Sequence, residues 1–310
     1  NFKGNFAYRL GHQMEIPPPG SSDGAIDPAT VVDVHAHLSP DGHLRWNPPA
    51  RAGAGGWTIM RVGFTPTGQH NISASAAGDG LDCDKFTQAA VDYHFDHVIA
   101  KVLADAGPLA GKSFTLVEID SYEVGMQNWS ADFPAEFRRR TGYDVRSYLP
   151  AMAGGRIVGD AARTERFLFD VRRVQADLMA ENYYGRMEEL CREHGLKFYV
   201  EGYGQGVFDE LQVSGVPDFP MTEFWERTPW TPNRTVKLVA SAAHVYGKPV
   251  VAAESFTGEE ETARWEEYPY SLKILGDEMF GLGVNQMFFH RFAQQPHPSA
   301  VPGMKMGPWG

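Results

Sequence analysis

The segment KPVVAAESFT, residues 248–257, decides the fold because it reads as a buried strand that ends in a charged residue. Its first half is apolar, and Glu254 comes where the strand gives way to a loop. Other segments follow the same plan, with apolar residues first and polar or acidic residues at the carboxyl end. Apolar runs of this length are typical of parallel strands that are covered on both faces. The predicted strands are residues 113–120, 196–201, 220–224, 248–254 and 284–290.

Helical segments alternate with these strands, and this alternation predicts a parallel sheet with helices on both faces. The segments with helical spacing of apolar residues are 83–106, 132–141, 160–195, 233–246 and 268–283. A doubly wound sheet usually carries a glycine-rich phosphate loop, and the sequence contains none. The pattern therefore favours a (β/α)8 barrel, in which the strand ends converge on one face. Because five such strands are found, residues 76–310 are expected to form the second part of an incomplete barrel, with three strands upstream of Asn1.

Residues 1–75 differ from the rest of the chain, since they combine chain breakers such as PPPGSSDG with short alternating runs. They predict a loop region followed by a small inserted β unit. The run VVDVHAHL at 31–38 places His35 and His37 two residues apart. On a strand both imidazoles would point to one side and could hold a divalent ion. A metal-dependent amidohydrolase-like enzyme is therefore one alternative, although it would need further metal-binding residues at later strand ends, where His290 is the one histidine.

The charge and composition of the chain indicate which classes of molecule it could bind. The net charge of −11, with Arg138–Arg140 as the one basic cluster, argues against nucleic acid or an anionic membrane as a partner. No run approaches the ~18 apolar residues of a membrane-spanning helix. Cys83 and Cys191 form no metal-binding or disulfide pattern. Aromatic residues make up 12% of the chain, and several lie beside polar residues in loop-like segments, which suits a carbohydrate cleft.

The acidic strand ends indicate a reaction that uses paired carboxyl groups. Glycoside hydrolysis needs one carboxylic acid to protonate the leaving oxygen and one carboxylate to activate water or attack the anomeric carbon. Glu123 and Glu254 both lie where a strand gives way to a loop, so both side chains can be exposed in a cleft. Glu118 and Glu201 are further candidates, but either could instead brace a neighbouring strand. A non-catalytic sugar-binding module is the other alternative that these residues allow.

Several long motifs carry a resemblance to a known family. The segments run in order from about Trp57 to the last residue and resemble glycoside hydrolase family 106, the α-L-rhamnosidases. They are LVEIDSYEVGMQNWSADFPAEFRRRTGYDVRSYLPAMAG (116–154), AENYYGRMEELCREHGLKFYVEGYG (180–204), MTEFW (221–225), ASAAHVYGKPVVAAESFT (240–257), YPYSLKILGDEMFGLGVNQMFFHRFAQQPHP (268–298) and PGMKMGPWG (302–310).

The resemblance implies an inverting glycosidase that releases terminal α-L-rhamnose from polysaccharides or glycosides. It implies a (β/α)8 catalytic domain in a secreted or periplasmic multidomain protein, so the remaining domains of a longer parent chain are expected partners. Glu123 would be the general acid, Glu254 the general base, and Glu223 a ligand of a calcium ion that helps hold the sugar hydroxyls. The residues that would line the sugar pocket are Asp120, Trp129, His290 and Arg291.

The same resemblance bears on the histidine motif. Family members do not usually carry two histidines in the segment equivalent to VVDVHAHLSPDGHLRW, which belongs to an inserted β region. We therefore expect His35 and His37 to be exposed strand residues rather than metal ligands.

Overall fold

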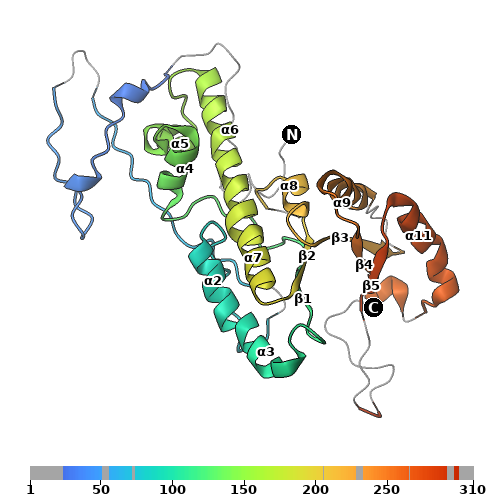
Figure 1. Cartoon of the computed structure of the whole chain (residues 1–310). Coiled ribbons are helices and arrows are strands. Elements are labelled where there is room, and N and C mark those ends of the chain that lie inside the picture. The colour runs from blue at the N-terminus through green and yellow to red at the C-terminus, as the bar shows by residue number, and fades with distance from the viewer. Residues whose placement is uncertain are drawn as a thin grey trace. The chain divides into compact units, whose positions relative to one another are not determined.

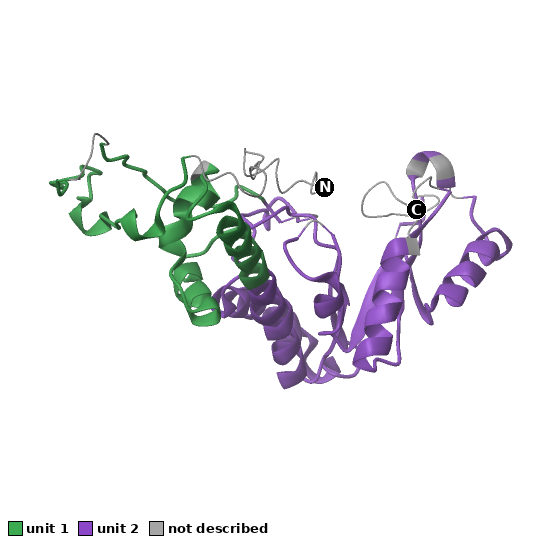
Figure 2. Ribbon diagram, turned by 90° about the horizontal axis from the view of Figure 1, so that it is seen from above, with its two compact units in different colours: residues 1–69, 128–175 green, residues 70–127, 176–310 purple. Residues whose placement is uncertain are grey.

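The computed structural model describes residues 24–50, 56–71, 74–204, 206–227, 233–264, 266–291 and 297–299. The chain forms two compact units, which Figure 2 colours separately. One unit combines Asn1–Gln69 with Asn128–Gln175, and the other combines His70–Gln127 with Ala176–Gly310. These units do not coincide with the division expected at residue 75, because the segment Asn128–Gln175 groups with the N-terminal residues.

The second unit contains a five-stranded parallel sheet (Figure 1). Its order is β1-β2-β3-β4-β5, so each strand pairs with the next one along the chain. A doubly wound sheet would reverse its order at a switch point, and this sheet does not. It is a curled half-barrel, as the sequence predicted. The strands are Leu116–Ile119 (β1), Lys197–Glu201 (β2), Phe219–Glu226 (β3), Ala252–Gly258 (β4) and Gln286–Phe289 (β5).

The five predicted helical segments are helical with two differences, and three short helices, Leu149–Gly154 (α5), Glu210–Ser214 (α8) and Glu260–Ala263 (α10), were not predicted. The segment predicted as one helix over 83–106 forms two helices that meet at Val98. The long run over 160–195 is continuous, but a π-helical segment, Met179–Gly185, interrupts its α-helical geometry. The α-helices are Gln88–His97 (α2), Ile99–Ala106 (α3), Phe133–Thr141 (α4), Leu149–Gly154 (α5), Ala161–Leu178 (α6), Arg186–Glu193 (α7), Glu210–Ser214 (α8), Asn233–Tyr246 (α9), Glu260–Ala263 (α10) and Pro269–Leu282 (α11). None of the described helices combines the length and the apolar character needed to cross a membrane.

The two faces of the sheet have separate cores, because side chains alternate along each strand. On one face, Phe224 and Ala253 pack with buried residues of α9 and α11, such as Val239 and Met279. On the other face, a smaller core consists of Tyr199, Met221 and Ala252 with partly buried neighbours that include Phe288. This second face carries the acidic residues, which continue in phase with its core towards the carboxyl ends of the strands.

The first unit has an aromatic core of its own. Phe137 of α4 packs edge-on against Phe167 of α6 with ring centroids 5.9 Å apart, and both rings are almost fully buried. Tyr148 stacks on Phe167 at 4.9 Å. The hydroxyl of Tyr143 donates a hydrogen bond to Asp170 Oδ2 at 2.9 Å. These contacts fix the inner side of α6 and leave its outer side open to solvent.

The small β unit expected within residues 1–75 is not found among the described residues of that region. His35–His37 forms one turn of 3-10 helix instead of a strand, and Leu38 and Leu44 make an isolated antiparallel bridge. Residues two apart point in different directions on a 3-10 helix of three residues per turn. His35 and His37 are exposed, as expected, but they do not share one face of a strand.

Candidate active site

Acidic residues from three neighbouring strands meet at the carboxyl end of the sheet. Glu223 of β3 lies directly opposite Glu254 of β4 in the parallel register, so the two side chains project from the same face. Glu201 ends β2, where it pairs with Met221 of β3. Asp120 follows the last residue of β1 in the same phase as Glu118. The sequence predicted these residues at strand ends, and this holds for Glu201, whereas β3 continues to Glu226 and β4 to Gly258. The parallel register brings the acidic side chains onto one face.

A short backbone segment after β1 connects Glu123 to this group. The backbone N–H of Ser121 donates to Asp120 Oδ1 at 2.8 Å and to Glu201 Oε2 at 3.1 Å. The Ser121 hydroxyl donates to Glu123 Oε1 at 2.8 Å. The N–H of Tyr122 donates to the carbonyl of Tyr203 at 3.0 Å, which holds the segment against the end of β2. One serine therefore contacts three carboxyl groups of the candidate site.

Carboxylate oxygens of Asp120, Glu201 and Glu254 lie within 4.8 Å of one another. Glu201 is fully buried, and its Oε1 has no hydrogen-bond partner among the described residues. Burial, together with the Asp120 carboxylate beside it, raises the pKa of Glu201 well above its usual value. Such a group either holds a proton or faces a cation, because a buried unpaired charge is costly. His35 and His37 are not part of any such group among the described residues, so the amidohydrolase alternative gains no support.

Glu254 has polar neighbours on both sides. The hydroxyl of Thr257 donates a short hydrogen bond to Glu254 Oε1. Burial raises the pKa of Glu254 to about 7, and the Asp120 and Glu223 carboxylates add to the shift, whereas the Thr257 bond opposes it. Glu254 is therefore poised to exchange a proton near neutral pH.

His290 and Arg291 approach Glu254 from the end of β5. Two N–H groups of the Arg291 guanidinium, Nη2 and Nε, point to His290 Nε2 at 2.8 and 3.0 Å. Because a guanidinium only donates, Nε2 must accept, and the ring proton is assigned to Nδ1. His290 Nδ1 lies 3.6 Å from Glu254 Oε1. Burial and the Arg291 charge lower the pKa of His290, so the imidazole is uncharged at neutral pH. The separation of 3.6 Å from Glu254 is longer than a hydrogen bond.

Glu223 is oriented by the tryptophan two residues further along β3. Trp225 Nε1 donates to Glu223 Oε2 at 2.8 Å, which is possible because residues two apart share one face of a strand. Burial raises the pKa of Glu223, and the Asp120 and Glu123 carboxylates contribute. Glu223 is not one of the three residues whose oxygens lie within 4.8 Å of one another, so its expected role as a calcium ligand stays a prediction.

One predicted site residue lies in the first unit, and three residues that contact the acidic groups were not predicted. Trp129 belongs to the first unit, where it packs against Phe133 with ring centroids 4.9 Å apart, and its expected contact with sugar stays a prediction. Ser121, Thr257 and Trp225 were not predicted as site residues. Trp225 could have been found from its spacing to Glu223, whereas Ser121 and Thr257 bind carboxyl groups through loop geometry that has no pattern in the sequence.

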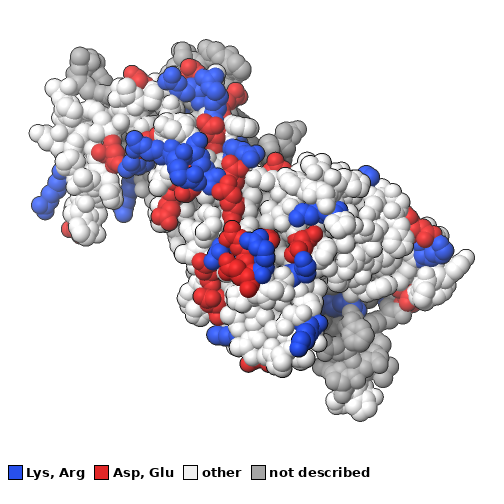
Figure 3. All heavy atoms as spheres, viewed as in Figure 1, with Lys and Arg blue, Asp and Glu red and all other residues white. Residues whose placement is uncertain are grey.

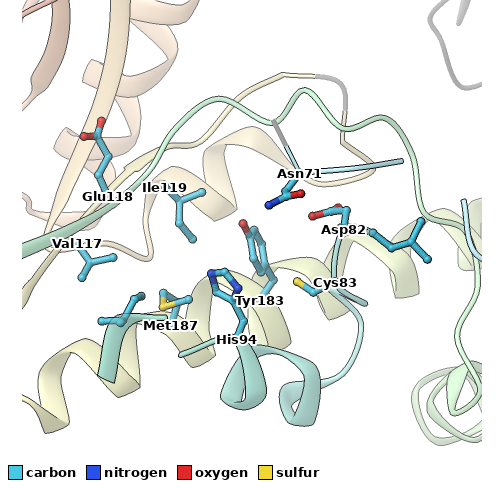
Figure 4. A pocket seen from close by; sticks show the side chains of 11 residues that line it. Asn71, Asp82, Cys83, His94, Val117, Glu118, Ile119, Tyr183 and Met187 are labelled. Atoms are coloured by element: carbon cyan, nitrogen blue, oxygen red, sulfur yellow. The ribbon is translucent and has the colours of Figure 1, made fainter. Parts of the chain in front are cut away.

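A pocket of about 220 Å³ lies on the other side of β1 (Figure 4). Val117 and Ile119 point into it towards His94 and Tyr183, whereas Glu118 points away. Burial raises the pKa of the lining Cys83 thiol and lowers that of His94, so both groups are uncharged at neutral pH. Burial and the neighbouring Asp120 carboxylate raise the pKa of Glu118 to about 7. The pocket is thus separate from the acidic face.

Comparison with known proteins agrees with this arrangement. A sequence model of glycoside hydrolase family 106, described as alpha-L-rhamnosidase, matches residues 1–310. The chain belongs to this family. The resemblance inferred from the motifs is therefore confirmed.

Two relatives show what part of such a protein the chain represents. A Formosa agariphila protein named "Putative beta-glucuronidase" is 41% identical over 285 residues, which are 92% of this chain and 24% of the relative. The structure of a rhamnosidase from Novosphingobium sp. PP1Y superimposes with a TM-score of 0.80 at 32% identity, covering 92% of this chain and 28% of that one. The chain thus spans about a quarter of the length of the relatives it matches.

Proposed function

We propose that this chain carries the catalytic acid and base of an inverting α-L-rhamnosidase. Glu123 acts as the general acid that protonates the leaving oxygen, and Glu254 acts as the general base that removes a proton from the attacking water. Inversion follows because the water attacks the anomeric carbon from the face opposite to the leaving group, in a single displacement. The observation that carries the proposal is the convergence of Glu254 with other strand-end carboxyl groups in a chain of this family.

The surroundings of Glu254 support its role as the base. A general base works best when its pKa lies near the working pH, and burial raises the pKa of Glu254 to about 7. The Thr257 hydroxyl donates a hydrogen bond that orients its carboxylate, and His290 Nδ1 lies 3.6 Å from the same oxygen. Glu123 is exposed and is held by Ser121, so it can reach a leaving oxygen in solvent.

Calcium is part of the proposal because the donor set fits a hard cation. Asp120, Glu201 and Glu254 would hold it, since calcium prefers oxygen ligands and carboxylates above all. The buried Oε1 of Glu201, which has no partner among the described residues, fits a metal ligand. When bound, the ion supplies positive charge that favours the carboxylate forms and binds sugar hydroxyls. Glu223 would lie at the rim of this set and remains a further candidate ligand.

The proposed substrate is a glycan or glycoside that ends in α-L-rhamnose, and Asp120, His290 and Arg291 would bind its hydroxyls. Trp129 would offer a ring face to the sugar. We also propose that the protein acts outside the cytoplasm, in the medium or the periplasm, and that the remaining domains of a longer chain complete the barrel. The family of this chain and its half-barrel support these assignments.

Two variants of the full-length protein test the roles of the acid and the base. Glu254→Gln should lower kcat by about 10³-fold on every substrate, because no other group activates the water. Glu123→Gln should lose a similar factor on alkyl rhamnosides but retain most activity on 2,4-dinitrophenyl rhamnoside, whose leaving group needs no proton. NMR of the first product formed should show the β anomer. Glu193→Gln, an exposed change on α7, is the matched control.

Three results would contradict the proposal. Normal turnover by Glu254→Gln would show that Glu254 is not the general base. An α anomer as first product would show that the enzyme retains the anomeric configuration. An aryl β-glucuronide belongs in the same assay because of the name that the Formosa relative carries. Cleavage of the glucuronide without cleavage of the rhamnoside would show that the proposed substrate is wrong.

A further inference from the structure

One lysine of the chain is buried next to the segment that carries Glu123. On the face that Figure 3 shows, lysine and arginine side chains lie at the surface, many of them beside acidic ones. Lys85 is 3% exposed, and it is the one buried lysine or arginine among the residues that the structure describes. Burying an ammonium group is costly unless it is paired, so its contacts should indicate what it does.

The ammonium group of Lys85 has two aromatic rings and an acidic residue as neighbours. Its Nζ lies 5.4 Å from the ring centroid of Tyr122 and 5.3 Å from that of Tyr183. Both distances are within the range of cation–π attraction, which extends to about 6 Å. The same Nζ forms a short ion pair with Asp82. Lys85 therefore links Tyr122, the residue before Glu123, to the π-helical segment that contains Tyr183.

The backbone of Lys85 holds the other end of the same segment. Its N–H donates to Gln127 Oε1 at 3.0 Å, and Gln127 Nε2 donates a short hydrogen bond to Asp84 Oδ1. Tyr122 and Gln127 flank Glu123 in the sequence. Lys85 thus contacts the segment on both sides of the proposed acid.

The π-helical segment provides a second support for Tyr122. Tyr183 approaches Lys85, and the adjacent Tyr184 packs edge-on against Phe208 with ring centroids 5.7 Å apart. Phe208 in turn packs edge-on against Tyr122, also at 5.7 Å. Two successive tyrosines therefore support Tyr122, one through Lys85 and one through Phe208. π-Helical turns within α-helices are frequent at functional sites, which agrees with a role of this segment in catalysis.

We propose that Lys85 is a positioning residue that holds the segment Tyr122–Gln127 so that Glu123 faces the leaving oxygen. The end of β2 already anchors the start of this segment through the backbone of Ser121 and Tyr122. Lys85 adds a contact to the Tyr122 ring and a hydrogen bond to the residue that closes the segment. Glu123 itself is exposed, so its position depends on the buried groups that hold its neighbours. The inference rests on the proposed role of Glu123 as the general acid.

Kinetics with two leaving groups test this proposal in the full-length protein. Lys85→Met removes the charge but keeps an unbranched side chain of similar length. It should lower kcat on an alkyl rhamnoside about tenfold or more, because a displaced acid transfers its proton less well. Turnover of 2,4-dinitrophenyl rhamnoside should be nearly unchanged, since its leaving group needs no proton. Gln127→Leu, which removes the second contact, should show the same dependence on the leaving group.

Three further variants separate positioning from a merely structural role. Val91→Ala, a buried change on α2, lowers stability and should reduce turnover of both substrates by the same factor. Lys197→Met breaks the ion pair with Asp218 at the first residue of β2, away from the acidic strand ends, and should leave both rates unchanged. Lys85→Arg keeps a cation for the two rings and should recover part of the turnover of the alkyl rhamnoside.

Equal losses on the two rhamnosides, or full activity of Lys85→Met on both, would overturn the proposal. If Lys85→Met does not fold, Gln127→Leu carries the same test. A crystal structure of the folded variant gives a readout that does not depend on turnover. The Glu123 carboxyl group should be displaced by about 1 Å, and an unchanged position would overturn the proposal. Failure of the proposed function is seen separately, as equal losses on the two rhamnosides in Glu123→Gln.

Discussion

At the scale of single residues, Glu254 sets the expected pH dependence of catalysis. As a base it must be ionised, and its pKa is raised to about 7, so kcat/KM should fall as the pH drops below about 7. A bound calcium ion favours the carboxylate, so added calcium should move this acidic limb to lower pH, and a chelator should move it back. A profile of kcat/KM on an aryl rhamnoside checks both shifts. If calcium left the acidic limb of the kcat/KM profile unchanged, the ion would not bind at Glu254.

Glu254 should also make the free energy of unfolding depend on pH. The folded state raises the carboxyl pKa from its usual 4.5 to about 7, so it binds the proton more tightly than the unfolded chain does. Its contribution to stability is therefore fully present below pH 4.5 and is lost as the pH rises through 7. With a chelator present, Glu254→Gln should gain on the order of 2 kcal/mol at pH 8 and little at pH 4.5, measured by urea unfolding. Glu193→Gln should show no such difference between the two pH values.

At the scale of elements, the end of β2 positions the segment that carries Glu123. Gly204 has φ +125°, and a Cβ there would lie 2.4 Å from the carbonyl oxygen of Tyr122. Gly204→Ala should displace Tyr122 and with it Glu123, and a shift of ~1 Å can lower kcat about 100-fold. Steady-state kinetics on an alkyl rhamnoside, which depends on the acid, measures this loss.

Gly195 supplies the matched control for that change. It also has a positive φ, +71°, but nothing lies within 4 Å of the position of its Cβ. Gly195→Ala should therefore cost about 1 kcal/mol of stability through backbone strain, with kcat retained. If both variants lost equal activity, the approach of Gly204 to Tyr122 would not be what orients Glu123.

At the scale of the whole molecule, calcium should stabilise the protein because several strands contribute its proposed ligands. An ion that binds only the folded state adds about 2.7 kcal/mol at a free concentration of 100 times its Kd. Thermal unfolding should therefore shift upwards with calcium and return with chelator. Asp120→Asn should reduce the shift, and magnesium, which demands stricter geometry, should produce a smaller one. A shift that survives in Asp120→Asn would place the ion elsewhere, with Glu223→Gln as the next variant to measure.

The local pattern of the sequence predicted the five strands and the longer helices of the half-barrel, but not the short helices α8 and α10. Most strands contain a run of apolar residues, and the predicted helices have apolar residues at helical spacing, so these elements follow from the local pattern. The same reasoning failed at His35–His37, where a short alternating run forms a 3-10 turn. A run that packs against no sheet has no neighbour to impose strand geometry on it.

The sequence by itself thus determined the elements, their order and the acidic ends of the strands, because these depend on neighbours within a few residues. The tertiary structure alone decided which acids meet. Ser121 contacts Glu201 across 80 residues of chain, and His290 reaches Glu254 from the next strand. It also placed Trp129 in the other unit. Such contacts arise from strand register and loop closure, which local patterns do not encode, and the raised pKa of Glu254 exists only where burial brings the carboxyl groups together.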